Sequence, residues 1–291
     1  MFENVLVGVD GTPNGRDAVA LATRLLTPGG TLTLAHVRAG ELQPLHAATP
    51  GMVAEEHAAS QKLLEDERDA IELPATLISI VGSNPGRELH RQAEEQGADL
   101  IAVGSSRRGY IGRVMLGDDT RGALNGAPCA VAIASRGYAE SPKPIADIGV
   151  GYNGSPEAKA ALEMALRVAA PTRARVRALE VVSIPTYAYT GPISPTIGDG
   201  LDVVLDEASK RMGALADVDE GRAVYGLTGE ELAAFGEEVD LLVVGSRSYG
   251  PWKRLVLGST SDFLERHARC SLLVLPRSAV DEHDEKDEKG T

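Results

Sequence analysis

The sequence predicts an α/β protein of two similar domains, each with a parallel β-sheet covered by helices on both faces. Short apolar runs of strand length alternate with amphipathic runs of helical length through the whole chain. The strand candidates are apolar on both faces, which is typical of a buried parallel sheet joined by right-handed helical crossovers. In addition, the same order of features occurs twice.

Two pairs of stretches show the duplication. Residues 99–120 read DLIAVGSSRRGYIGRVMLGDDT and residues 241–260 read LLVVGSRSYGPWKRLVLGST. Likewise VGVDGTPNG, from Val7, returns as VGYNGSPEA, from Val150. Because one core rarely fills a chain of 291 residues, two domains of about 140 residues are expected. The predicted boundaries are 1–138 and 145–278 for the domains, 139–144 for the linker and 279–291 for an acidic disordered tail.

The elements of the first domain begin with a strand over residues 4–9. Thr12 suits the N-cap of the following helix and Pro13 its first turn, and the helix should stop before Pro28. Further strands are expected at 31–37, 75–81, 99–104 and 129–134, and further helices at 54–69, 85–96 and 120–125.

The second domain repeats this plan. Ser155 and Pro156 take the places of the first cap and the first-turn proline. In each domain the expected strand order is 3-2-1-4-5. The strands of the second domain are expected at 147–151, 175–182, 222–225, 240–245 and 271–275, and its residues 261–269 form an amphipathic segment.

A ligand crevice is expected where the strand order reverses, beyond the carboxyl ends of strands one and four. In the second domain, the basic, glycine-bearing loop after strand four closes at Gly258, Ser259 and Thr260 before a helix. Unpaired amides at a helix N-terminus, approached closely where glycine lacks a side chain, favour an anion such as phosphate. Asp10 and Asn153 follow strand one and would face a ligand whose phosphates lie on this loop.

These motifs resemble those of the universal stress protein family, present in tandem. The family's phosphate-loop pattern, G-x2-G-x9-G-[S/T], follows a strand, and its strand-one pattern is a Val-Gly-Val-Asp run like that at residues 7–10. The resemblance covers about residues 1–277. It implies flavodoxin-like (HUP-type) domains that pair through their fifth strands, and members that either hold ATP in the crevice or do not bind it.

The second domain keeps the family spacing of Gly245, Gly258 and Ser259, but it departs at two positions. Ser248 replaces the second glycine, and Asn153 replaces the strand-one aspartate. Serine still occupies a turn and donates to phosphate, and asparagine still bonds a ribose hydroxyl, although it is a poorer magnesium ligand than a carboxylate. This site is therefore expected to bind the nucleotide.

The first domain keeps Asp10, Gly104 and Gly117. However, Arg107 replaces the second glycine, and Asp118 stands where serine or threonine is expected. A carboxylate at that helix start satisfies the amides itself and repels phosphate, whereas arginine pairs with phosphate. The first site is expected to be the weaker one, and binding at both sites remains open.

By resemblance, adenine would sit near the ends of strands two and three, close to Val37 and Val81 in the first domain and to Val182 and Val224 in the second; a core-packing role is the alternative for these valines. Asp10 is also the candidate ligand for magnesium bound with ATP. The predicted contacts are Gly8, Asp10, Val37, Gly104, Arg107 and Gly117 in the first domain and Gly151, Asn153, Val182, Gly245, Ser248, Arg254, Gly258, Ser259 and Thr260 in the second.

Composition argues against several partners. The formal charge of -13 disfavours nucleic-acid binding, and no uninterrupted apolar run approaches the ~20 residues of a membrane span. No basic region precedes the N-terminal apolar run, so a cytoplasmic protein without a signal peptide is expected. The partners expected are an adenine nucleotide and an unidentified protein. The two domains should pair within the chain, and two chains should form a homodimer.

Catalysis has little support in the sequence. The six histidines show no metal-ligand spacing, and neither a GxSxG elbow nor a GxxxxGK[ST] loop occurs. Cys129 and Cys270, at equivalent places in the repeats, are expected to be buried apolar residues. Three hypotheses follow: an ATP-binding regulatory protein of the stress response, an interaction module of the same fold with decayed sites, and a weak ATPase. ATP should change the emission of the sole tryptophan, Trp252, if the first holds.

Overall fold

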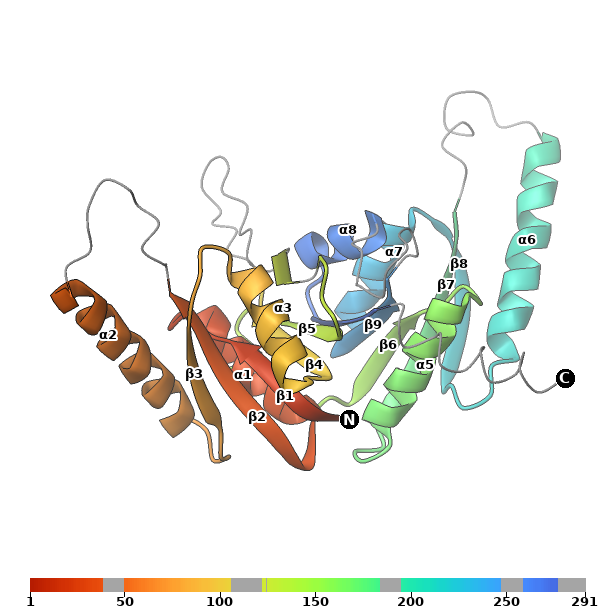
Figure 1. The fold of residues 1–291 in the computed structure, drawn as a ribbon. Coiled ribbons are helices and arrows are strands. Elements are labelled where there is room, and N and C mark those ends of the chain that lie inside the picture. Colours follow the sequence, from red (N-terminus) through yellow and green to blue (C-terminus); the bar gives the residue numbers. More distant parts are fainter. Residues whose placement is uncertain (39–49, 106–121, 124, 184–194, 247–258, 277–291) are drawn as a thin grey trace, which may run out of the picture. The chain divides into compact units, whose positions relative to one another are not determined.

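In the computed structural model the chain forms two units of α/β structure (Figure 1). The first unit holds Met1–Pro144, and the second begins at Ile145. The structure describes residues 1–38, 50–105, 122–123, 125–183, 195–246 and 259–276. The predicted α/β class, with a parallel sheet in each repeat, is confirmed. Within these described ranges, no helix is both long enough and apolar enough to cross a membrane.

The first unit contains a parallel sheet with the order β3-β2-β1-β4-β5. The strands are β1 (Phe2–Gly8), β2 (Leu26–Arg38), β3 (Thr76–Val81), β4 (Leu100–Gly104) and β5 (Ala130–Ala134). The helices in its described part are α1 (Pro13–Leu25), α2 (Pro50–Asp69) and α3 (Pro85–Gln96). Right-handed crossovers put α1 and α2 on one face of this sheet and α3 on the other.

The second unit repeats this arrangement, with the order β8-β7-β6-β9-β10. The strands are β6 (Asp147–Gly151), β7 (Arg175–Ser183), β8 (Glu220–Gly226), β9 (Leu241–Gly245) and β10 (Ser271–Leu275). The helical segments described in this unit are α5 (Pro156–Ala169), α6 (Pro195–Gly213), α7 (Thr228–Phe235), η2 (Gly236–Glu238) and α8 (Ser259–His267). In both units the strand-one loop therefore lies beside the end of the fourth strand.

An aspartate just before the fourth strand of each unit fixes the neighbouring first strand. The carboxylate of Asp99 accepts hydrogen bonds from the backbone N–H groups of Glu3 and Asn4, at 2.7 and 3.0 Å. Asp240 accepts from two consecutive backbone N–H groups at the start of β6, both at 2.9 Å. Hydrogen bonds to a charged acceptor are stronger than neutral ones, so each aspartate holds the register between the two strands that flank the crevice.

The structure corrects several predicted boundaries. Strand β2 begins at Leu26, immediately after α1, instead of at Thr31. The extra residues follow the edge of β1 with a register shift, and Gly29, at φ +83°, allows this bend. Helix α2 starts at Pro50 instead of Ala54, and α8 covers Ser259–His267 instead of 261–269.

Of the two residues predicted to cap helices, Ser155 makes the expected hydrogen bond and Thr12 does not. Ser155 caps α5 as expected, because its hydroxyl accepts a hydrogen bond from the backbone N–H of Ala158 at 3.2 Å. Thr12 stands at the N-cap of α1, but its side chain does not cap the helix. Instead, its hydroxyl and its backbone N–H both donate to Asp10 Oδ1, at 2.6 and 2.9 Å. The strand-one aspartate therefore closes a local turn.

A buried carboxylate holds the segment after β5 against the first unit. Asp17 on α1 is only 1% exposed, and its two oxygens accept hydrogen bonds from the backbone N–H groups of Gly137 and Ala139, at 2.8 and 2.7 Å. Gly137 has φ +78°, a conformation that suits a turn at glycine. Ala139, the first residue of the predicted linker, thus packs with the first unit.

Helix α2 is attached to the sheet through a chain of polar groups. His36 Nδ1 on β2 lies 2.8 Å from Ser60 Oγ on α2, and Ser60 Oγ lies 2.7 Å from Ser79 Oγ on β3. Burial lowers the pKa of His36, Arg38 lowers it further, and the nearby Asp10 raises it. The net shift is downward, so the folded protein favours the neutral imidazole.

We expect replacement of Asp17 by alanine to release the turn after β5. Two part-buried N–H groups would lose a charged acceptor, at a cost of about 1–3 kcal/mol in unfolding free energy. Trypsin should then cut the Arg136–Gly137 bond faster, as followed by mass spectrometry of the fragments. Asp17→Asn, which keeps one carbonyl acceptor, should give an intermediate rate. Equal rates in all three proteins would contradict this role for Asp17.

We also expect His36 to make the stability depend on pH. Its pKa is lower in the folded protein than in the unfolded chain, so the neutral ring stabilises the fold above the unfolded pKa of about 6.5. This contribution is lost as the pH falls through the folded pKa. Urea denaturation at pH 7.5 and pH 5 should show a smaller loss of stability in His36→Gln than in the unchanged protein. The same loss in both would argue against this role.

Candidate functional site

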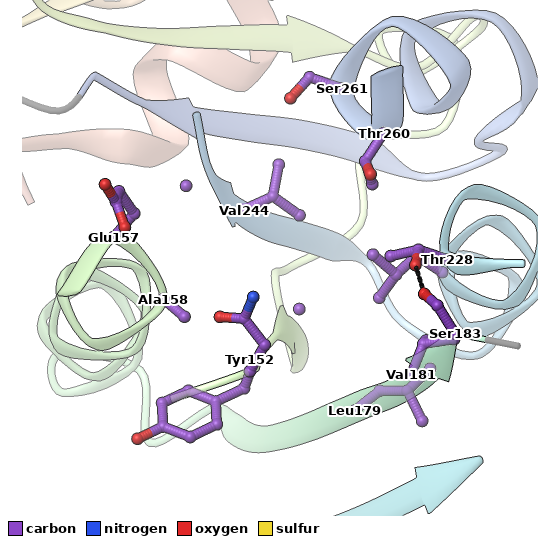
Figure 2. Close-up of a pocket in the computed structure, with 14 residues that line it drawn as sticks. Tyr152, Glu157, Ala158, Leu179, Val181, Ser183, Thr228, Val244, Thr260 and Ser261 are labelled. Carbon is purple, nitrogen blue, oxygen red and sulfur yellow. Dashed lines mark hydrogen bonds between the residues drawn. The ribbon is translucent and has the colours of Figure 1, made fainter. Parts of the chain in front are cut away.

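A cavity of about 160 Å³ opens in the second unit beyond the carboxyl ends of β6, β7 and β9 (Figure 2). Its walls come from these strands, from the loop between β6 and α5, from the first turn of α5, from α7 and from the start of α8. The lining residues are Gly151, Tyr152, Asn153, Glu157, Ala158, Leu179, Val181, Ser183, Thr228, Leu232, Val244, Gly245, Thr260 and Ser261. The cavity thus lies where the sequence places the crevice.

Two glycines line the cavity where strand one and strand four end. A Cβ atom at Gly245 would lie 2.7 Å from the carbonyl oxygen of Glu157, in the first turn of α5. At Gly151 a Cβ atom would lie 3.2 Å from Leu232 of α7. Gly104 repeats the first contact, because a Cβ atom there would overlap the carbonyl oxygen of Asn14. These glycines are therefore needed for helix packing, independently of any ligand.

Hydroxyl groups and helix amides gather at the start of α8. Thr260 and Ser261 both line the cavity, and Ser261 is only 4% exposed. The first-turn N–H groups of a helix lack partners within the helix and carry partial positive charge. This end of the cavity therefore has the chemistry of an anion site, built from residues next to the predicted Ser259.

The strand-one loop supplies the amide predicted to meet a ribose. Asn153 Oδ1 accepts a hydrogen bond from the backbone N–H of Ser155 at 3.1 Å, which fixes the side-chain amide at the cavity wall. The NH₂ group is then the donor of this side chain. Glu157 also lines the cavity, and Figure 2 shows its carboxylate on the same side as Tyr152, away from Ser183 and Thr228.

The apolar wall of the cavity corrects one predicted residue. On β7 the side chains that line the cavity are Leu179, Val181 and Ser183, which share one face because strand residues alternate. Val182 lies on the other face with Glu180, which pairs with an arginine of α6. The sheet register explains the shift by one residue: Gly8 pairs with Ala35 and Gly151 with Leu179, so Val181, two residues beyond Leu179, is the counterpart of Val37.

Several lining residues were not predicted from the sequence. Helix α7 supplies Thr228 and Leu232 to the cavity. The repeated plan implies a helix after the third strand, but it gives neither the bounds of this helix nor these two contacts. Its position was open to inference, because the first repeat has α3 directly after its third strand. Tyr152 and Glu157 lie within the stretch VGYNGSPEA, but they differ from the corresponding residues of the first repeat, so the duplication does not single them out.

Helix α2 approaches the equivalent loop of the first unit, although Asp10 and Gly11 remain exposed. A Cβ atom at Gly11 would lie 2.8 Å from Leu63 of that helix. Glu67, also on α2, is 7% exposed; burial raises its pKa, and its carboxylate lies 3.8 Å from the Arg16 guanidinium. Asp10 raises the pKa of Glu67 further, which places the Asp10 carboxylate close to Glu67 at this loop.

The remaining predicted contacts divide into two groups. The structure describes Gly8, Asp10, Val37 and Gly104 in the first unit. Among the described residues, no group of three or more His, Cys, Asp or Glu side chains is arranged to hold a metal ion. The magnesium role of Asp10 stays a prediction. Residues outside the described ranges are Arg107, Gly117, Asp118, Ser248, Trp252, Arg254 and Gly258.

The cysteines behave as buried apolar residues, as predicted. Cys129 and Cys270 are free thiols, each 9% exposed. Burial raises the pKa of both thiols to about 12. Because only the thiolate is a good nucleophile, neither residue is suited to covalent catalysis near neutral pH.

Comparisons with known proteins agree with the motifs. The sequence profile of the universal stress protein family matches residues 1–135 and 145–276. A universal stress protein of Mycobacterium tuberculosis is 28% identical over 297 residues, which cover 94% of this chain and 97% of the relative. A universal stress protein of Mycobacterium bovis matches to the same extent.

Solved structures show the same fold. The crystal structure of a universal stress protein from Archaeoglobus fulgidus superposes with a TM-score of 0.65 at 20% identity, covering 94% of this chain and 98% of that one. A functionally unknown protein from Pseudomonas aeruginosa gives a TM-score of 0.61 at 14% identity, covering 99% and 98%. At these identities the similarity concerns the fold alone.

We expect Gly245→Ala to lower the free energy of unfolding by about 1–3 kcal/mol, because the methyl group would force α5 away from the end of β9. Urea denaturation measures this loss. Gly213→Ala is the matched control, since a Cβ atom at Gly213 meets no atom within 4 Å. Equal free energies of unfolding for the two variants would show that α5 can move away from Gly245 without destabilising the protein.

Proposed function

The chain belongs to the universal stress protein family, with the family's domain present twice, and we propose that it is an ATP-binding regulatory protein of the stress response. The observation that carries the proposal is the cavity of the second unit. It combines an apolar wall, two glycines without side chains and hydroxyls at the N-terminus of α8. A nucleotide needs an apolar surface for its base, space beside the main chain for its ribose, and hydrogen-bond donors for its phosphates.

In this proposal the base packs against Leu179, Val181 and Leu232. The NH₂ group of Asn153 donates to the ribose, and the phosphates reach the first turn of α8 at Thr260. This order along the cavity follows from chemistry, because an apolar wall suits an aromatic base and helix amides suit an anion.

Magnesium bound to the phosphates would make this placement of the nucleotide more favourable. Glu157 lines the cavity, and its negative charge would otherwise oppose a triphosphate. A divalent cation reduces that repulsion. The first unit is the weaker candidate in this proposal, since Asp10 and Glu67 add two carboxylates near its loop.

Regulation is favoured over turnover by the lining residues given above. They include one carboxylate, Glu157, but no histidine, lysine or cysteine that would serve as a dedicated proton carrier. In the proposed role, nucleotide occupancy biases the loops around the cavity. Phosphate release in the presence of MgATP should accordingly be no faster than in buffer.

The proposal predicts that a negative charge at the start of α8 abolishes binding without unfolding the protein. Thr260→Asp places a carboxylate where acidic residues stabilise a helix by about 0.3–1 kcal/mol, but it repels phosphate. Isothermal titration calorimetry with MgATP should show heat for the unchanged protein and at least about tenfold weaker binding for this variant.

Thr260→Asn is the control, because it has the shape of aspartate without the charge. It should bind MgATP within about fivefold of the unchanged protein. The absence of binding by the unchanged protein would refute the proposal. Equal binding by the Asp and Asn variants would show that the phosphates lie elsewhere.

A further inference from the structure

Two hydroxyl groups form a polar end to the apolar wall of the cavity. Ser183 is the last residue of β7, and Thr228 is the first residue of α7. Their oxygens, Oγ and Oγ1, are 2.8 Å apart. Both residues line the cavity, and Figure 2 shows the hydrogen-bonded pair across the cavity from Glu157. Ser183 shares its face of β7 with Val181, so the hydroxyls continue the surface on which we place the base.

The fold does not use these hydroxyls to cap a helix. The N-cap position of α7 is Leu227, and no side chain makes a cap hydrogen bond there. In the first unit, by contrast, Asn84 precedes α3 and accepts a hydrogen bond from the backbone N–H of Arg87 at 2.9 Å. In the second unit, therefore, the polar side chain at the start of the helix after the third strand bonds Ser183 and does not cap that helix.

A hydrogen-bonded hydroxyl pair can offer both a donor and acceptors. Each hydroxyl has one hydrogen and two lone pairs, and the bond between Ser183 and Thr228 uses one hydrogen. The other hydrogen and the remaining lone pairs are available to a third group. Because hydroxyls rotate, either oxygen can be the donor, and the outward pattern can reverse.

This reversibility matters for the two purine bases. Adenine has an amino donor at C6 beside a ring nitrogen acceptor, whereas guanine has a carbonyl acceptor at C6 beside a ring N–H donor. A fixed donor and acceptor would match one base and leave unpaired polar groups against the other. A rotating pair matches both.

We propose that Ser183 and Thr228 contact the polar edge of the base and accept adenine and guanine with similar affinity. This inference rests on the proposed function, since it concerns the base of the nucleotide held in the same cavity. It assigns the site to purine nucleotides as a class, with the hydroxyl pair as its base-contacting element.

The test is calorimetric titration with MgATP, MgGTP and MgCTP. The unchanged protein should bind ATP and GTP with dissociation constants within about tenfold of each other, and CTP more weakly because the smaller ring does not reach the pair. The double variant Ser183→Ala, Thr228→Val should bind ATP and GTP about tenfold more weakly, with both affected equally. Thr228→Ser keeps both hydroxyls and should preserve both affinities.

The outcomes separate this inference from the proposed function. Binding of ATP with GTP more than about a hundredfold weaker would overturn the inference and leave ATP binding intact. Unchanged affinities in the double variant would also overturn it. No heat with any nucleotide would refute the proposed function together with the inference. Circular dichroism of each variant identifies losses that come from unfolding.

Discussion

The close contact between the end of the fourth strand and the helix after the first strand determines the geometry of both units. Gly104 lies against the carbonyl oxygen of Asn14, and Gly245 lies against that of Glu157. No larger residue fits without moving a helix. This contact brings the strand-one loop and the end of the fourth strand together at the carboxyl edge of the sheet, which is where ligands of such folds bind.

Around this shared backbone the two units have diverged in side-chain chemistry. The register places His36 and Glu180 at the same position of the second strand, facing the helix that covers it. His36 meets a serine of α2, whereas Glu180 forms an ion pair with Arg211 of α6 at 2.6 Å. Each unit thus has a buried polar attachment for that helix. These attachments add to the apolar packing of Leu64 on α2 and of Ala208 and Met212 on α6. The ion pair is weakened by salt, whereas the apolar packing is not.

The alternation of strands and helices, the duplication and the location of the crevice were accessible from the sequence because they depend on local patterns. Individual lining residues were less accessible. Val182 was predicted where Val181 lines the cavity, since residue similarity does not reveal the pairing register that decides which face a side chain occupies. Thr12 was a plausible cap, but the carboxylate of Asp10 competes for its hydroxyl. Helix α7 is only eight residues long, and its apolar pattern is correspondingly brief.

The buried carboxylate of Asp17 has a consequence for how the protein is divided experimentally. The family profile ends at residue 135, yet the amides that satisfy Asp17 belong to Gly137 and Ala139. A fragment truncated at the profile boundary would lack both N–H groups that satisfy this carboxylate in the intact chain. Separate expression of the N-terminal half should therefore extend at least through Glu140, just ahead of the Ser-Pro-Lys-Pro sequence that leads into the second half.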